Sequence, residues 1–137
     1  MQDVKEILKS YIDFERYARK CFREVDMAEE TLLRSPRMDG MPRSGNISGL
    51  DEQVAQIDRL KRKANKERQK ALDAQEQIYD MISTLKNPRQ KAVIKLRYIY
   101  GESWDEIASS LELKKRMVLY IHGKALAELR KDCTSLH

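Results

Sequence analysis

The sequence predicts an all-α fold, with a long N-terminal antiparallel helical hairpin of coiled-coil-like character and a C-terminal domain of shorter helices. Apolar residues recur at alternating intervals of three and four, the spacing that places them on one face of a helix. No stretch alternates apolar and polar residues as a half-buried strand does. Three of the five Gly and two of the three Pro lie within residues 36–49, which indicates a single long loop.

The first helix is predicted to run from about Asp3 to Arg34. Its apolar seam is unbroken over four heptads, and a seam of this length indicates pairing with another helix. The seam consists of Val4, Ile7, Tyr11, Phe14, Ala18, Cys21, Val25, Ala28 and Leu32. Pro, Gly and Ser then predict a loop over residues 35–49.

A second helix is expected from Leu50 or Asp51, with the same apolar rhythm as far as Leu85. Two long helices joined by one loop most simply form an antiparallel hairpin, here residues 1–86. Some apolar side chains lie outside both seams and would be only partly covered in a single hairpin. They are Leu8, Leu33, Val54, Leu72 and Ile82. We therefore expect the hairpin to mediate a homo-oligomer.

The C-terminal domain, residues 87–137, contains clear helix start and stop signals. Asn87 and Pro88 predict a helix start, with the helix ending at Tyr100 before a left-handed Gly101. The residues from Ser103 to Glu106 form a capping box for a short helix that ends near Leu111. A longer helix with a cationic start follows and runs to about Lys131, so the two helices make a helix-turn-helix.

The positive charge of the chain is uneven along the sequence. The net charge is +5, and residues 87–137 alone carry ten Lys/Arg and six Asp/Glu, a net +4. An excess at one end is expected of a domain that binds a polyanion, although moderate basicity also aids solubility. A second basic run, residues 59–70, is more typical of a solvated helix face, with a second phosphate-binding track as the alternative.

Several functional classes have no support in the sequence. No apolar run approaches membrane-spanning length and the N-terminus lacks a signal peptide, so the cytoplasm is the expected location. No Gly-rich phosphate loop, Ser/His/Asp set or metal-ligand spacing occurs, so we expect neither an enzyme nor a cofactor. Cys21 and Cys133 are far apart, and Cys21 is expected to be a buried free thiol. His122 is expected to be partly buried rather than to bind a metal.

A family resemblance is carried by "LRYIYGESWDEIA" at residues 96–108 and "VLYIHGKAL" at residues 118–126. Residues 87–131 resemble the region 4 helix-turn-helix of bacterial sigma factors and, more closely, phage late-transcription regulators of the ArpU and RinA type. The segment "MDGMPRSG", residues 38–45, is also similar to the segment joining the N-terminal helices of those phage proteins. The resemblance covers nearly the whole chain.

The resemblance implies a sequence-specific DNA-binding transcriptional regulator that activates phage late genes for packaging or lysis. Such a protein acts in the cytoplasm of the bacterial host and could also contact RNA polymerase. Two alternatives stay open. One is a DNA-packaging or assembly protein similar to a small terminase subunit. The other is a sigma-like protein that acts mainly through RNA polymerase.

The resemblance also implies which residues would bind double-stranded DNA. The start of the second helix of this motif enters the major groove. Arg and Lys suit the acceptors of guanine, and Leu suits the thymine methyl group. The expected base-reading residues are Lys115, Arg116, Leu119 and Tyr120. The expected phosphate contacts are Arg89, Lys91, Arg97, Lys114 and Lys124, of which the first three could equally be ordinary surface charges.

Two positions depart from the usual pattern of the family. Glu112 stands in the turn where Gly is common, and a left-handed conformation would cost a non-Gly residue about 1–2 kcal/mol. We therefore expect a different turn geometry here. Lys114 stands where a Ser often caps the second helix, which leaves the first amides without a side-chain cap. A DNA phosphate could bind those amides instead.

Overall fold

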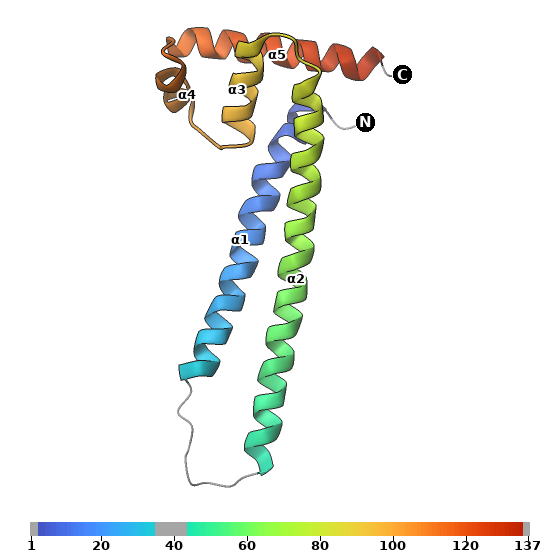
Figure 1. Cartoon of the computed structure of the whole chain (residues 1–137), viewed down its shortest axis with the longest axis vertical. Coiled ribbons are helices and arrows are strands. Elements are labelled where there is room, and N and C mark those ends of the chain that lie inside the picture. Colours follow the sequence, from blue (N-terminus) through green and yellow to red (C-terminus); the bar gives the residue numbers. More distant parts are fainter. Residues whose placement is uncertain (1–2, 35–43, 136–137) are drawn as a thin grey trace. The chain divides into compact units, whose positions relative to one another are not determined.

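A computed structural model describes the backbone of residues 3–34 and 44–135, and the side chains of residues 3–34 and 49–131. Every regular element in these ranges is a helix, as predicted (Figure 1). The helices are α1 (Val4–Arg34), α2 (Ser44–Ser83), α3 (Pro88–Tyr98), α4 (Trp104–Leu111) and α5 (Lys115–Ser135). Residues 35–43, which include most of the predicted loop and most of the segment 38–45, lie outside the described residues, as does the Cys133 side chain.

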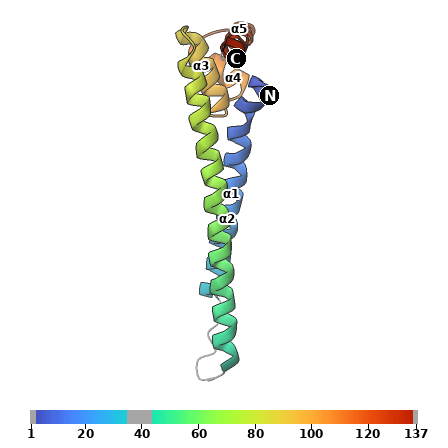
Figure 2. The same cartoon turned by 90° about the vertical axis from the view of Figure 1, so that its right-hand side faces the viewer.

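The chain divides into two compact units, one made of residues 1–14 and 71–137 and the other of residues 15–70. Within each unit α1 and α2 lie side by side in opposite directions (Figures 1 and 2). In the first unit Gln75 Nε2 donates a hydrogen bond to Tyr11 Oη at 3.3 Å. In the second, Lys61 Nζ lies 3.4 Å from Glu29 Oε1. The antiparallel hairpin is thus confirmed.

The core of the 15–70 unit is small. One buried cluster consists of Cys21, Val25 and Ala64, with Phe22 and Leu60 packed at its edge, and Ala18 and Ile57 of the same unit are also buried. Cys21 is a free, buried thiol, as expected. Because Ala18 and Ala64 are small, the two helices bury little apolar area where these residues lie.

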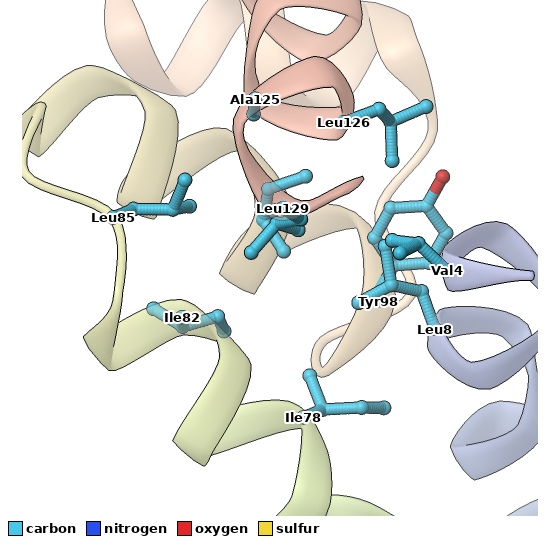
Figure 3. Packing of buried hydrophobic residues seen from close by; sticks show 10 residues of the cluster. Val4, Leu8, Ile78, Ile82, Leu85, Tyr98, Ala125, Leu126 and Leu129 are labelled. Atoms are coloured by element: carbon cyan, nitrogen blue, oxygen red, sulfur yellow. The ribbon is translucent and has the colours of Figure 1, made fainter. Parts of the chain in front are cut away.

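In the larger core of the first unit, the start of α1 and the end of α2 pack together with α3 and α5 (Figure 3). It contains Val4, Leu8, Ile78, Ile82, Leu85, Ile94, Tyr98, Ala125, Leu126 and Leu129. The predicted boundary between residues 86 and 87 therefore falls inside a single packed unit.

Two of the five side chains expected to be partly covered are in fact buried. Leu8 is 0% exposed and Ile82 is 7% exposed, because residues of α3 and α5 pack with them in this core. That part of the prediction was wrong. Leu33, Val54 and Leu72 remain exposed, as predicted.

The second helix begins at Ser44, earlier than the predicted start at Leu50 or Asp51. No proline follows Pro42 in this stretch, so every residue from Ser44 onward can donate its backbone N–H. Extending an existing helix is far easier than nucleating one, even through glycines that cost about 1 kcal/mol each. The Gly and Ser content of residues 44–49 was therefore a misleading loop signal.

The connection from α3 to α4 follows the predicted capping signals. Asn87 Oδ1 accepts hydrogen bonds from the amides of Arg89 and Gln90, and Gly101 has a φ of +70°. Helix α3 ends at Tyr98 rather than Tyr100, because the amides of residues 99 and 100 both donate to the Lys95 carbonyl. The capping box of Ser103 and Glu106 is present in both directions, with N···O distances of 3.1 Å.

The turn between α4 and α5 is left-handed in spite of Glu112. This residue has φ 55° and ψ 43°, so the expectation of a different turn geometry was wrong. The Leu113 amide donates to the Ala108 carbonyl at 2.9 Å, and the Glu112 amide donates to the Ser109 carbonyl at 3.3 Å. These bonds hold the chain in a conformation that a non-Gly residue disfavours.

The Glu112→Gly substitution is expected to raise the free energy of unfolding by up to about 1 kcal/mol. Glycine relieves the left-handed strain, and the greater freedom of the unfolded chain removes part of that gain. Chemical denaturation of both proteins measures the difference. The Glu128→Gly control, in the interior of α5, should instead lower stability by about 1 kcal/mol. A loss of stability in Glu112→Gly would contradict the strain argument.

Candidate nucleic-acid interface

The three C-terminal helices pack around a core of their own. It consists of Val93, Ile107, Ala108, Val118 and Ile121, bordered by Leu96, Trp104, Leu111 and Leu113. On α5, Val118 and Ala125 are 0% exposed, which fixes the inward face of this helix. Residues on the side of α5 opposite to Val118 and Ala125 must then face solvent.

The outward side of α5 presents the four residues predicted to read bases. Lys115 and Arg116 are exposed, Leu119 is 42% exposed and Tyr120 is 61% exposed. Met117, which sequence reasoning missed, is 45% exposed on the same surface. Met117 lies three residues before Tyr120, a spacing that places both on the same side of a helix, so the sequence did contain an indication of its position. An open groove of about 500 Å³ is lined by Lys114, Arg116, Met117 and Tyr120.

The start of α5 is rich in positive charge and has no acidic residue in its first turn. The Lys114 carbonyl accepts the first helical bond, from the Val118 amide at 3.1 Å, so Lys114 stands at the cap position. Lys115 Nζ lies 3.6 Å from Asp105 Oδ1 on α4, with both side chains more than half exposed. An exposed pair of this kind contributes about 0–1 kcal/mol, which leaves most of the unfavourable dipole interaction in place.

The predicted phosphate contacts fall into two groups. Arg89, Lys91, Lys114 and Lys124 are exposed, and Lys124 Nζ lies 5.6 Å from the centre of the Tyr120 ring. Arg97 is half-buried, donates to the Glu102 carbonyl at 3.0 Å and lies 4.3 Å above the Trp104 ring. These contacts favour a structural role for Arg97.

His122 belongs to a buried polar cluster that the sequence did not indicate. Its side chain is 8% exposed, so it is more deeply buried than the partial burial that the sequence predicted. Its Nε2 shares a hydrogen bond of 2.6 Å with the Tyr98 hydroxyl, and the Trp104 ring packs edge-on at 4.7 Å. Burial, together with the charges of Lys5 and Arg97, lowers the pKa of His122 from 6.5 to about 4. His122 is therefore neutral at physiological pH and braces α3 and α4 against α5.

Acidification from pH 6.5 to pH 4 is expected to reduce stability by up to about 3 kcal/mol through His122. The unfolded histidine binds a proton with a pKa of 6.5 and the folded one only near 4, so the unfolded state is favoured as pH falls. Denaturation followed by the fluorescence of Trp104, the single tryptophan, measures this. Glutamine does not titrate, so in the His122→Gln variant this part of the fall in stability between pH 6.5 and pH 4 should disappear. A variant with the same pH dependence of stability as the original protein would show that His122 is not its cause.

Gly123 lies exposed on α5 next to the residues predicted to bind DNA. A Cβ atom built there would meet no other atom within 4 Å. The packing of the free protein therefore does not require glycine, although glycine costs about 1 kcal/mol in a helix interior.

Comparison with known families supports the assignment of this region. The family model described as Sigma-70, region 4 matches residues 84–131. This part of the chain is a sigma-70 region 4-like helix-turn-helix. It indicates a DNA-binding function related to transcription. No curated protein and no solved structure matches the chain.

Two kinds of site are absent from the described residues. None of their helices combines the length and the apolar character needed to cross a membrane. Nor do three or more His, Cys, Asp or Glu side chains come together there in a group that could hold a metal ion.

Proposed function

We propose that this protein is a sequence-specific DNA-binding regulator that activates late genes of a bacteriophage in the cytoplasm of the bacterial host. The role is one of binding rather than catalysis. The observation that supports it most is the exposed cationic and apolar side of α5, at the start of the second helix of a sigma-70 region 4-like motif. The link to phage late genes rests on the family resemblance of residues 96–108 and 118–126.

In the proposed complex the first turns of α5 lie in the major groove. Lys115 and Arg116 donate to guanine acceptors, and Leu119 packs on a thymine methyl group. A phosphate binds the amides that Lys114 leaves uncapped, and Arg89, Lys91 and Lys124 hold the flanking backbone. DNA would then compensate the unfavourable charge at the start of α5.

We further propose a homo-oligomer formed through the long helices. Exposed apolar side chains on them support this, with Leu33 80% exposed, Leu72 46% and Val54 44%. A symmetric dimer would place two copies of α5 on one duplex and raise affinity without new contacts. Sedimentation of the full chain decides: a monomer at tens of micromolar that still binds its operator tightly would contradict the oligomer.

Footprinting on phage DNA distinguishes the proposed function from its alternatives. Protection upstream of the late genes, with or without polymerase, is the expected result. Protection at a packaging site instead would favour a small terminase-like role. Protection that requires host RNA polymerase would favour a sigma-like role, in which polymerase is contacted directly.

The Arg116→Ala substitution is expected to weaken operator binding by about 1–3 kcal/mol and to relax the preference at one base pair. Its guanidinium lies on the exposed side of α5, where no described acidic side chain pairs with it. Competition binding with single-base operator variants measures both effects. Arg34→Ala, an exposed arginine of α1, is the matched control. Equal weakening of every operator variant would make Arg116 a phosphate contact.

A further inference from the structure

The 15–70 unit is as basic as the C-terminal residues 87–137. It has fourteen Lys/Arg and ten Asp/Glu, a net +4. Half of its cations lie within residues 59–70 of α2, where Glu67 is the only acid. These cations are Arg59, Lys61, Arg62, Lys63, Lys66, Arg68 and Lys70. This concentration is separate from the helix-turn-helix and plays no part in the function proposed above.

Four of these cations lie on one side of α2, and we call them the hairpin cationic face: Arg59, Arg62, Lys66 and Lys70. Their spacing of three, four and four places them on a single helix face about 16 Å long. All four are exposed, whereas Ala64 and Ala71 of the same stretch are buried toward α1. The cationic face therefore points away from α1.

The cations beside this face have partners within the hairpin. Lys61 pairs with Glu29 at 3.4 Å, Lys63 Nζ lies 5.7 Å from the centre of the Tyr17 ring, and the Arg68 guanidinium lies 5.8 Å from the centre of the Phe22 ring. These three side chains therefore help to hold α1 against α2, and packing within the hairpin explains them.

The hairpin cationic face is only partly neutralised. Lys70 pairs with Glu67 at 3.2 Å, and Arg59 donates a hydrogen bond to the neutral Gln56. Among the described side chains, Arg62 and Lys66 have no ion-pair partner. Like charges three or four residues apart repel one another and destabilise a helix.

The outward side of α1 in the same unit is different. Arg16 and Lys20 also face solvent, but Asp13 lies three residues before Arg16 and Glu24 four residues after Lys20. Mixed charge at these spacings is typical of a solvated helix surface. On the α2 side, Asp58 and Asp73 lie at the two edges of the hairpin cationic face, and the four face positions between them are all cations.

We propose that the hairpin cationic face binds the phosphate backbone of duplex DNA, independently of base sequence, as a second contact in addition to the helix-turn-helix. A duplex carries one negative charge per about 1.7 Å of its axis, so a face of this length meets several phosphates. The four side chains include no aromatic ring on which an unpaired base could stack, which favours the backbone over single strands. Release of condensed counterions would drive the binding.

The test measures how the affinity of the full chain for a short random-sequence duplex depends on salt. In the triple variant Arg59→Gln, Arg62→Gln and Lys66→Gln, glutamine preserves helix propensity. The slope of log K against log salt should become shallower by about 2–3, and low-salt affinity should fall about tenfold or more. Circular dichroism and thermal unfolding check the fold. If the triple variant is unstable, Arg62→Gln with Lys66→Gln should still reduce the slope by about 2.

The matched control is Arg16→Gln, Lys20→Gln and Arg23→Gln, which removes the same charge from the outward side of α1. An unchanged slope in the α2 variant, or an equal loss in both variants, would overturn the proposal, because net charge alone would then explain binding. A Lys115→Gln and Arg116→Gln variant tests the helix-turn-helix separately. If only the helix-turn-helix variant lowers affinity, the proposed function stands and the second contact is wrong. If only the α2 variant lowers affinity, the second contact stands and the proposed function is wrong.

Discussion

Replacing Leu8 with alanine is expected to lower the free energy of unfolding by about 2–5 kcal/mol, the range for a buried leucine. Leu8 is 0% exposed in the core that contains Ile78, Ile94 and Leu129 (Figure 3). The substitution should therefore destabilise the helix-turn-helix, although Leu8 precedes it by about eighty residues of sequence. Denaturation followed by Trp104 fluorescence measures the effect where it is expected.

The matched control is Leu33→Ala on the same helix. Leu33 is 80% exposed, so its truncation removes little buried surface and should change stability by less than about 0.5 kcal/mol. Equal effects of the two substitutions would show that Leu8 is not packed against the C-terminal helices.

Replacing Val25 with aspartate is expected to destabilise the 15–70 unit by more than about 3 kcal/mol. Val25 is 4% exposed, and its core partners are Cys21 and Ala64. A buried carboxylate there has to lose its hydration or force the helices apart, and such a small core cannot compensate. Because this unit has its own core, we expect local opening rather than global unfolding.

Amide hydrogen exchange resolves that local opening. Protection should fall in residues 15–34 and 49–70 and persist in α3, α4 and the described part of α5. Met27→Asp is the matched control, since Met27 is 61% exposed and an aspartate there stays hydrated. If Val25→Asp leaves protection in residues 15–34 intact, the assignment of this small core is wrong.

Helical periodicity predicted the contact between α1 and α2 but not the contact of either helix with the C-terminal region. The seam residues Val4, Cys21 and Val25 are buried as the spacing indicated. Leu8 lies outside that seam and is buried in a core that also contains Leu126 and Leu129, more than a hundred residues later. A local pattern shows which side of a helix is apolar, and it cannot identify a second covering element so distant in sequence.

The outward side of α5 could be predicted because it depends on local periodicity alone. Once Val118 and Ile121 face inward, Arg116 and Tyr120 must face outward, and the structure places them so. The pairing of Tyr98 with His122 spans twenty-four residues and depends on how α3 packs against α5. The left-handed Glu112 was missed for another reason: the hydrogen bonds that the turn gains outweigh a local preference.

The shared core of the first unit couples DNA binding to the ends of the hairpin. A ligand that binds only the folded state stabilises every part of the cooperative unit to which it is attached. DNA held by α5 would therefore also hold the first turns of α1, through the core that Leu126 and Leu129 share with Val4 and Leu8. By reciprocity, a change that loosens those first turns would weaken DNA binding to the extent that DNA binding stabilises them. The first turns of α1 would thus influence DNA affinity although they lie outside the helix-turn-helix.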